Sequence, residues 1–344
     1  MDKTFYIGRR LIGEASPPLV IAEVGINHNG QLEKAFHLVD AAIKAGAECI
    51  KFQCHITDAE MVKTDMKPGK ISDETLWDII KRCELSAEEE YRLKKYCDSK
   101  GILFLSTPFS REAADRLEAM GVKAFKIGSG ECNNIPLIEH IARKKKPIIL
   151  STGMNNLNSI GKTVQRIKKY DAKLMLMHCT SMYPTPYDKV RLRAIMELKK
   201  AFRVPVGLSD HSLGIYTCLG AVALGACVLE KHFTCSKDWP GPDIKISIDP
   251  KELKDLVIGA RAVFEARGGK KTILKEEKPV IDFAYASVCT ISPVTKGERF
   301  TSNNVWVKRP GIGQIPASSI QKVLGKKSKR DIASGVLIKK TDIE

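Results

Sequence analysis

The fold of this chain is decided by a stretch that repeats one structural unit, residues 86–127, SAEEEYRLKKYCDSKGILFLSTPFSREAADRLEAMGVKAFKI. Ser86 and Glu89 have the spacing of a capping box, and Ser110 stands where a second helix would begin. The two predicted helices end at Gly101 and Gly121, and the apolar runs that follow them are Ile102–Ser106 and Ala124–Ile127. Helix and strand therefore alternate, which is the order of a parallel sheet covered by helices.

The same alternation extends in both directions, from about residue 19 to residue 267. The predicted strands are Leu19–Val24, Cys49–Gln53, Ile102–Ser106, Ala124–Ile127, Pro147–Ser151, Leu174–His178, Pro205–Leu208 and Cys227–Phe233. Eight such units in roughly 250 residues are typical of a TIM (β/α)8 barrel, whose active site lies at the carboxyl ends of the strands. A doubly wound sheet with a dinucleotide site is disfavoured, because Gly128-Ser-Gly130 and Gly311-Ile-Gly313 both lack the third glycine of that motif.

The chain is long enough for a barrel and a small second domain. Residues 1–267 would form the barrel, and residues 268–284 are rich in charged and turn residues, as in a linker. Residues 285–344 contain short β-type runs at Ser287–Ile291, Val305–Val307 and Gly335–Ile338. A domain of about 60 residues has a small core, so we expect it to gain stability by docking on a larger surface.

Composition narrows the class of protein. No apolar run approaches the roughly 18 residues of a membrane span, and the N-terminus does not resemble a signal peptide. We therefore expect a cytoplasmic protein without a membrane partner, whose ten scattered cysteines are buried thiols. The formal net charge of +16 suits nucleic acid or a small anionic substrate. Because the densest basic run, residues 325–330, has no interleaved aromatic residues, a nucleic-acid partner is not expected.

Polar and ionisable residues stand at the carboxyl end of nearly every predicted strand. They are Glu23, Lys51, Gln53, Thr107, Lys126, Ser129, Glu131, Ser151, Thr152, His178, Ser209, His211, Glu230 and His232. Several are spaced i and i+2, as are Lys51 and Gln53, so they point to one face of the strand. One such residue could be a helix cap, but the whole set predicts a site in the barrel mouth.

Two lysines of this set, Lys51 and Lys126, stand among hydroxyl-bearing residues. Ammonium groups, hydroxyls and backbone amides at helix starts are what a bound phosphate requires. The sequence therefore predicts an anion site. A Schiff-base lysine is the competing hypothesis, but it needs an uncharged amine, which many hydroxyls and a phosphate would oppose.

Two histidines, His211 and His232, end neighbouring predicted strands. Neutral imidazoles, with the other coordination positions filled by water and substrate, suit a divalent metal such as Mn²⁺, Co²⁺ or Zn²⁺. The run Ser209-Asp-His211 is not a Ser/His/Asp triad, because consecutive residues of an extended segment point to opposite faces. Asp210 is instead expected to support its neighbours.

Eight motifs resemble, in this order, those of the bacterial sialic acid synthases. They are Ile21-Ala-Glu-Val-Gly-Ile-Asn-His-Asn-Gly30, Ile50-Lys-Phe-Gln53, Leu105-Ser-Thr-Pro-Phe-Ser110, Phe125-Lys-Ile-Gly-Ser-Gly-Glu131, Leu150-Ser-Thr-Gly-Met154, His178-Cys-Thr-Ser-Met-Tyr-Pro184, Gly207-Leu-Ser-Asp-His-Ser212 and Glu230-Lys-His-Phe-Thr234. Trp306-Val-Lys-Arg-Pro-Gly311 is similar to the C-terminal antifreeze-like (SAF, β-clip) domain of that family. The resemblance implies a TIM barrel followed by a small β-rich domain. It also implies condensation of phosphoenolpyruvate with N-acetylmannosamine to give N-acetylneuraminate, a nine-carbon 2-keto acid, and phosphate.

The resemblance implies a role for each site residue. Phosphoenolpyruvate would be held by Lys51, Thr107, Lys126, Ser129, Ser151, Ser181 and Ser209. Ser181 departs from the asparagine of some members, and its shorter side chain leaves that contact open. The sugar would face Glu23, Gln53, Tyr183, Glu230, Asp243 and Arg309. His211 and His232 would ligate the metal, and Arg309 would come from the partner chain of a domain-exchanged homodimer.

The implied chemistry assigns the catalytic residues. The metal would polarise the aldehyde of the open-chain sugar while C3 of phosphoenolpyruvate attacks it. The cationic centre that forms at C2 needs negative charge and a water molecule nearby. Glu131 or Glu230 could stabilise this cation or take a proton from that water, and the sequence leaves the choice open. With His211 and His232, these carboxylates are the predicted catalytic residues.

Several alternatives stay open. The N-acylated hexosamine could be a diacetamido-trideoxyhexose, which would give legionaminic or pseudaminic acid. The expected metal is Mn²⁺, with Mg²⁺ or Co²⁺ as alternatives. Outside this family, a Schiff-base aldolase would be trapped by borohydride, and a metal-dependent hydrolase would need more ligands than two histidines. A nucleic-acid-binding module would show salt-dependent binding.

Overall fold

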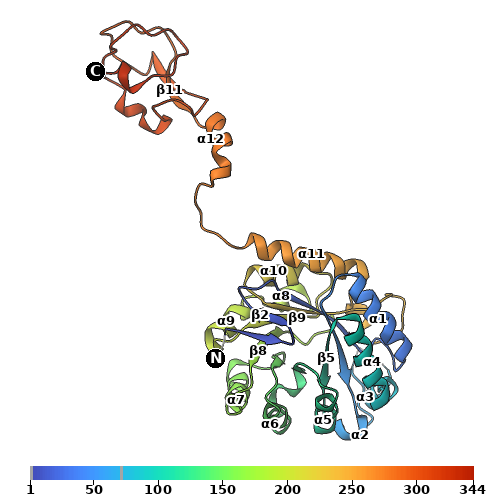
Figure 1. The fold of residues 1–344 in the computed structure, drawn as a ribbon. Helices are drawn as coiled ribbons and strands as arrows, with labels where there is room; N and C mark the ends of the chain where they lie inside the picture. The colour runs from blue at the N-terminus through green and yellow to red at the C-terminus, as the bar shows by residue number, and fades with distance from the viewer. Residues whose placement is uncertain (1–2, 70–72) are drawn as a thin grey trace. The chain divides into compact units, whose positions relative to one another are not determined.

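The computed structural model describes residues 3–69 and 73–344 of the chain. The chain divides into two compact units, Met1–Gly268 and Gly269–Glu344, and each is described by itself (Figure 1). Within the described ranges, no helix combines the length and the apolar character that a membrane crossing requires. All ten cysteines are free thiols, and nine of them are buried.

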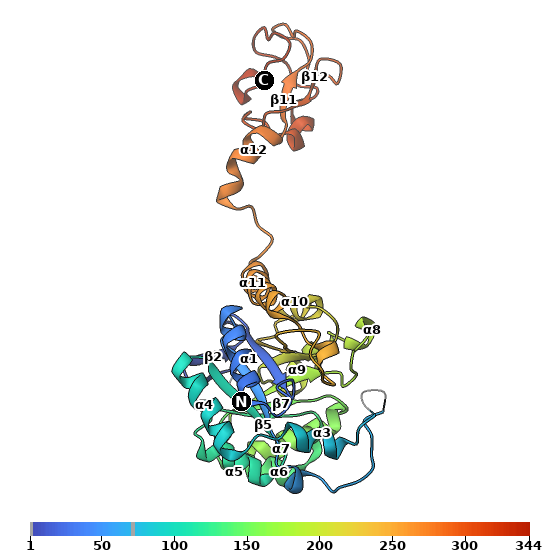
Figure 2. The ribbon, with the colours of Figure 1, turned by 90° about the vertical axis from the view of Figure 1, so that its right-hand side faces the viewer.

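A sheet of eight strands forms the centre of the first unit. Its strands are β3 (Leu19–Gly25), β4 (Cys49–Cys54), β5 (Leu103–Pro108), β6 (Phe125–Ile127), β7 (Ile148–Ser151), β8 (Leu174–Cys179), β9 (Val206–Asp210) and β10 (Val228–His232). They lie in the order β5-β4-β3-β10-β9-β8-β7-β6, with parallel pairing between neighbours. Because β5 and β6 at the two ends are also neighbours, the sheet curls into a nearly closed barrel (Figure 2). The predicted TIM-type fold is confirmed.

Helices follow the strands along the chain. They are α1 (Leu32–Lys44), α2 (Thr57–Glu60), α3 (Leu76–Cys83), α4 (Ala87–Lys100), α5 (Arg111–Ala119), α6 (Ile135–Arg143), α7 (Leu157–Lys168), α8 (Tyr187–Val190), α9 (Ala194–Phe202), α10 (Tyr216–Ala223) and α11 (Pro250–Ala266). Short 3-10 turns lie at Gly130–Asn133 and Ile244–Ile246. The predicted capping box is present: the Ser86 hydroxyl accepts from Glu89 N, and the Glu89 carboxylate accepts from Ser86 N at 2.8 Å. Helix α4 ends where Gly101 takes the left-handed φ of 75° that favours glycine.

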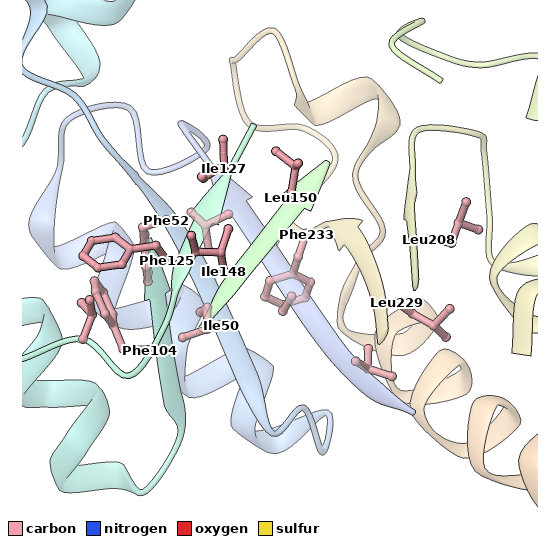
Figure 3. Packing of buried hydrophobic residues seen from close by; sticks show 14 of the residues in the cluster. Ile50, Phe52, Phe104, Phe125, Ile127, Ile148, Leu150, Leu208, Leu229 and Phe233 are labelled. Carbon is pink, nitrogen blue, oxygen red and sulfur yellow. The ribbon is translucent and has the colours of Figure 1, made fainter. Parts of the chain in front are cut away.

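Alternate residues of each strand face opposite sides of the barrel wall. Ile50 and Phe52 of β4 belong to the large core between sheet and helices, where Phe52 stacks on Phe104 at 5.8 Å between ring centroids (Figure 3). Cys49 of the same strand belongs to a second core inside the barrel. Lys51 lies two residues further along that inner face, so polar side chains replace the apolar core toward the carboxyl ends of the strands.

A short hairpin that the sequence pattern does not predict adds to this inner core. Strands β1 (Thr4–Ile7) and β2 (Arg10–Gly13) pair antiparallel. Their side chains Phe5, Ile7 and Ile12 are buried with apolar residues from the strands of the barrel. Since apolar groups fill this part of the interior, the polar layer at the strand ends is where a substrate can bind.

The second unit has its own small core. Its elements are the 3-10 turn Lys275–Glu277, α12 (Lys278–Ala284), β11 (Ser287–Thr290), β12 (Val305–Lys308) and the 3-10 turns Ala317–Lys322 and Lys340–Asp342. Strands β11 and β12 pair antiparallel around a buried cluster that includes Phe300. The predicted run Gly335–Ile338 is not a regular strand, but Ile338 N donates to Val288 O at 3.0 Å. Part of the segment predicted as a linker, residues 268–284, is helical in α12.

A buried histidine in the loop between β3 and α1 makes the stability of the first unit depend on pH. The side chain of His28 is 1% exposed, and its Nδ1 accepts a hydrogen bond from Gly30 N at 3.1 Å. Burial, helped by repulsion from His55, lowers the pKa of His28 from its usual value to about 4. The unfolded chain therefore binds a proton between about pH 6.5 and 4 that the folded chain does not.

We expect the free energy of unfolding to fall by about 2 kcal/mol between pH 7 and pH 5 from this histidine alone. In His28→Gln this contribution is absent, so the pH dependence should be shallower by that amount. Urea unfolding followed by circular dichroism at the two pH values measures it. His37→Gln, at an exposed position of α1, is the control for the exchange of a histidine for glutamine. Equal slopes for all three proteins would contradict the prediction.

Candidate active site

Four buried charged side chains meet inside the barrel at the strand ends: Glu23, Lys51, Lys126 and Glu230. They come from β3, β4, β6 and β10. Each occupies an inward position of its strand, two residues beyond a side chain of the apolar inner core. Closure of the barrel therefore places two ammonium groups and two carboxylates in one enclosed space.

Lys51 is held by three of the predicted residues. Its Nζ lies 2.7 Å from Glu23 Oε2 and donates to Thr107 Oγ1 at 3.1 Å. Glu230 Oε1 lies 4.0 Å away on the other side. Gln53, on the same strand, donates a long hydrogen bond of 3.5 Å to Glu23 Oε1. This part of the predicted anion and sugar sites is thus a single connected network.

Lys126 has a matching environment across the barrel. Its Nζ donates to Ser151 Oγ at 2.8 Å and lies 3.4 Å from Glu230 Oε1. The same oxygen of Glu230 accepts from Ser209 Oγ at 3.0 Å. Glu230 therefore links the two lysines, while its other oxygen, Oε2, is buried and has no hydrogen-bond partner among the described residues.

Burial and mutual attraction set the charges of these groups. Burial raises the pKa of Glu23 to about 7, although Lys51 opposes the shift. For Lys51, burial opposes the charged form, but the carboxylates of Glu23 and Glu230 outweigh it and raise the pKa. For Glu230, burial favours the neutral form, and the two lysines outweigh it and lower the pKa. Burial lowers the pKa of Lys126. Anions bind readily where such cations are already desolvated.

Two predicted hydroxyls flank Gly153 in the loop after β7. Ser129 Oγ accepts a hydrogen bond from Gly153 N at 3.0 Å. A Cβ atom at Gly153 would lie 2.8 Å from Ser129 Oγ and still closer to Ser181 Oγ. Glycine therefore leaves room for both hydroxyls beside this loop, and a hydroxyl can donate a hydrogen bond to a phosphate or carboxylate oxygen.

The two predicted metal ligands lie together beside this network. The ring centroids of His211 and His232 are 5.4 Å apart, and Tyr183 packs on His211 at 4.2 Å. His211 Nδ1 is 3.1 Å from Thr180 O, so its other nitrogen is available to a ligand. Within residues 3–69 and 73–344, His232 Nδ1 is buried with no hydrogen-bond partner, and Asp243 Oδ2 lies 3.7 Å away.

The pKa values of the two histidines shift in opposite directions. Burial, together with repulsion from His211 and the lysines, lowers the pKa of His232 well below its usual range. For His211, burial opposes protonation, but the Cys179 thiol and the Thr180 carbonyl outweigh it and raise the pKa. Burial raises the pKa of Asp243 to about 6. His232 is therefore an orphaned imidazole in the neutral form that ligates a divalent metal, whereas His211 would have to release its proton when a metal binds.

One predicted residue of the barrel, Glu131, is not brought into this cluster, and Arg309 belongs to the second unit. Glu131 lies in the 3-10 turn Gly130–Asn133, where its carboxylate accepts from Asn134 Nδ2 at 2.6 Å. Among the described residues, no contact joins Glu131 to the lysines or histidines of the mouth. Arg309 is exposed on the second unit, immediately before Pro310. Their catalytic and sugar-binding roles stay predictions.

Several residues of the mouth escaped prediction from strand ends alone. Asn27 donates to Phe233 O and to Ser247 Oγ, both at 2.9 Å, and Ser247 Oγ donates to Asp243 O. It therefore ties the loop after β3 to the loop that carries Asp243. His55 contacts Gln53 Oε1 at 3.0 Å and Glu60 at 2.9 Å. The i+2 spacing from Gln53 could have identified His55.

Comparisons with known proteins agree with this geometry. Residues 38–272 match the NeuB family, and residues 285–344 match the SAF domain. An N,N'-diacetyllegionaminic acid synthase of Campylobacter jejuni is 40% identical over 93% of this chain and 98% of its own length. A pseudaminic acid synthase of the same species is 38% identical over 94% and 96%. The crystal structure of an N-acetylneuraminic acid synthetase from Leptospira borgpetersenii, in complex with citrate, is 35% identical and has a TM-score of 0.74 over 81% of this chain and 95% of its own.

Proposed function

We propose that this chain condenses phosphoenolpyruvate with an N-acylated hexosamine, because it belongs to the NeuB family. Its relatives include an N,N'-diacetyllegionaminic acid synthase, and residues 285–344 match the SAF domain. The products are a nine-carbon 2-keto acid and phosphate. The single observation that best supports this proposal is a pair of buried lysines that share one carboxylate oxygen. Glu230 Oε1 lies 4.0 Å from Lys51 Nζ and 3.4 Å from Lys126 Nζ. Such a pair suits the phosphate and carboxylate of phosphoenolpyruvate.

In this mechanism the lysines and hydroxyls bind and orient phosphoenolpyruvate. Lys51 and Lys126 neutralise its charge, while the hydroxyls of Ser129 and Ser151 direct its oxygens. C3 then forms a bond to the aldehyde carbon of the sugar, water adds to C2, and the C2–O bond to phosphate breaks. A short-lived cation forms at C2 during these steps, and the site has to stabilise it.

Glu230 is the carboxylate that the geometry favours for that task. It lies between both lysines, and one of its oxygens has no protein donor in the described residues. That oxygen is free to stabilise the cation or to take the proton of the attacking water. Glu131, held by Asn134, is the alternative base that the sequence also predicts.

His211 and His232 would hold the divalent metal, with Mn²⁺ proposed and Mg²⁺ or Co²⁺ as alternatives. When bound, the metal supplies a Lewis acid for the sugar aldehyde. No group of three or more His, Cys, Asp or Glu side chains in the described residues is arranged to hold a metal ion. The two imidazoles would thus provide only part of the coordination shell, and binding should be reversible.

For the sugar we propose N-acetylmannosamine. A 2,4-diacetamido-trideoxyhexose is the second candidate, because a relative that is 40% identical is an N,N'-diacetyllegionaminic acid synthase. The side chains predicted to face the sugar include Glu23, Gln53 and Asp243, which lie at the mouth. We further propose a domain-exchanged homodimer in which Arg309 of one chain completes the sugar site of the other.

The test is a phosphate-release assay with phosphoenolpyruvate and each candidate sugar in turn. The sugars are N-acetylmannosamine and the diacetamido precursors of legionaminic and pseudaminic acid. We expect rapid phosphate release with one of the three, and mass spectrometry of the product identifies the acid. Release with no sugar above the rate without sugar would refute the proposed reaction.

Removal of the metal gives a further prediction. Dialysis against EDTA should lower the rate by about a hundredfold or more, because a Lewis acid contributes several kcal/mol to such a step. Mn²⁺, Co²⁺ or Mg²⁺ should restore activity, and circular dichroism should show an unchanged fold throughout. His232→Ala should weaken metal binding with the fold intact. Full turnover in excess EDTA would rule out a metal-dependent reaction.

A further inference from the structure

A fully buried ion pair joins β9 and β10, the two strands at whose carboxyl ends His211 and His232 lie. Lys231 Nζ lies 2.7 Å from Asp210 Oδ2, and the exposed fraction of both side chains is 0%. Asp210 and Lys231 stand opposite each other in the register of β9 and β10. The pair is therefore a cross-strand contact between β9 and β10 at their carboxyl ends.

The same pair holds the turn that follows β9. Asp210 accepts hydrogen bonds from Ser212 N at 3.0 Å and from Thr217 Oγ1 of α10 at 2.7 Å. Lys231 Nζ donates to the carbonyl oxygen of Ser212. His211 lies between Asp210 and Ser212, so the residues on both sides of this histidine are held by the ion pair.

Strand alternation explains why the pair acts on the site without touching it. Ser209 and Glu230 form a cross-strand pair on the inner face of the barrel, with a hydrogen bond of 3.0 Å between their side chains. Asp210 and Lys231 follow them on the opposite face, against α10. The next residues, His211 and His232, directly follow these two cross-strand pairs, and their ring centroids are 5.4 Å apart.

Stability alone does not account for two buried charges at this place. Removing an ammonium and a carboxylate from water costs several kcal/mol each, and apolar pairs of similar volume are often equally stable or more so. An apolar pair does not fix the relative orientation of two side chains, because dispersion contacts tolerate sliding and rotation. Charged hydrogen bonds do not tolerate them. The pair is thus suited to fixing how two strand ends lie relative to each other.

We propose that the Asp210–Lys231 ion pair is a positioning device that sets the separation of the His211 and His232 imidazoles, and thereby the affinity of the barrel for a divalent cation. The inference rests on the proposed function, since the cation site is part of it. Asp210 and Lys231 touch neither substrate nor cation and act only through the two histidines.

The experiment measures Mn²⁺ binding to the full chain, by electron paramagnetic resonance of the free ion, independently of turnover. Asp210→Asn combined with Lys231→Met removes both charges and leaves no unpaired ion. We expect the Kd for Mn²⁺ to rise by about 10- to 100-fold, as when a metal ligand loses its supporting partner. The thermal unfolding midpoint should stay equal or rise, because the buried charges are gone.

A second ion pair of the first unit serves as the matched control. Arg116 and Glu90, of α5 and α4, lie 2.9 Å apart and away from the histidines. Glu90→Gln combined with Arg116→Met should leave Mn²⁺ affinity unchanged. If this control weakens Mn²⁺ binding as much as the Asp210/Lys231 variant, or if that variant binds Mn²⁺ like the unmodified chain, the positioning role is wrong.

Failure of the proposed function would look different. If the unmodified chain binds no Mn²⁺, the cation site itself is wrong, and the positioning role with it. Thr217→Val keeps the test available should the double variant not fold, because it removes one donor to Asp210 without changing charge. An unchanged Mn²⁺ affinity in Thr217→Val would then count against the inference, and a weakened affinity with unaltered stability would support it.

Discussion

Lys126→Ala is expected to lower kcat/KM for phosphoenolpyruvate by about 10²- to 10³-fold, while the KM for the sugar changes little. The reason is that the buried ammonium group donates to Ser151 and balances the charge of Glu230, so its loss removes a positive charge from the place where the substrate anion would bind. Without it, Glu230 faces the incoming trianion with only Lys51, 4.0 Å away, to balance its charge. Steady-state kinetics with either substrate varied measure both constants.

Lys51→Ala should act in the same direction and add a structural effect, because Glu23 loses its partner at 2.7 Å. The control is Lys123→Ala, which removes the same charge from an exposed position three residues before Lys126. Since Lys123 precedes β6, at the end of the barrel away from the mouth, its loss should leave the kinetics unchanged. A change confined to the KM of the sugar in either active-site variant would contradict the assignment of these lysines to phosphoenolpyruvate.

The same lysines decide the competing Schiff-base hypothesis. Burial lowers the pKa of Lys126, which is the condition that an amine nucleophile needs. The carboxylate of Glu230, 3.4 Å away, opposes this shift of the pKa and favours the ammonium form. Borohydride added during turnover should therefore leave no reduced adduct on Lys126, and the mass of the protein should stay unchanged.

Mixing two inactive chains is expected to restore activity. One chain carries Arg309→Ala and the other His232→Ala, and each homodimer alone should be nearly inactive. In the heterodimer, the barrel of the Arg309→Ala chain has both histidines and would receive Arg309 from its partner. After subunit exchange at equal concentrations, about a quarter of the unmodified activity should return, because half of the dimers are mixed and each has one complete site.

The charges of the second unit support this expectation. In residues 285–344, Lys and Arg outnumber Asp and Glu by eleven to four. A surface of that sign should dock beside acidic groups such as those of the barrel mouth. Native mass spectrometry establishes that heterodimers have formed. If they have and no activity returns, the small domain does not complete a partner's site, and deletion after Glu277 then tests whether it is needed at all.

Local patterns predicted most of the fold. The capping box of Ser86 and Glu89, the hydroxyl of Ser110 and the apolar runs between helices act over a few residues, so their signals are complete within short stretches of sequence. The sequence pattern did not predict the hairpin of β1 and β2, because each of its strands has only four residues. These strands are stabilised by burial of Phe5 and Ile12 in the barrel interior, which a local pattern does not show. The run Gly335–Ile338 was predicted as a strand but joins β11 through isolated backbone hydrogen bonds.

The sequence by itself determined which chemical groups stand at the strand ends, because period and spacing place Lys51, Lys126, Glu230, His211 and His232 on the inner face of a barrel. Only the tertiary structure decided which of them touch. Lys126 and Glu230 come within 3.4 Å although 104 positions separate them in the chain, because closure of the sheet turns the inner faces of β6 and β10 toward the same part of the barrel interior. Spacing also could not separate Glu230 from Glu131, since each stands near the carboxyl end of a strand. The difference arises because one carboxylate is carried into the desolvated interior between two ammonium groups, while the other turns with its 3-10 segment to Asn134.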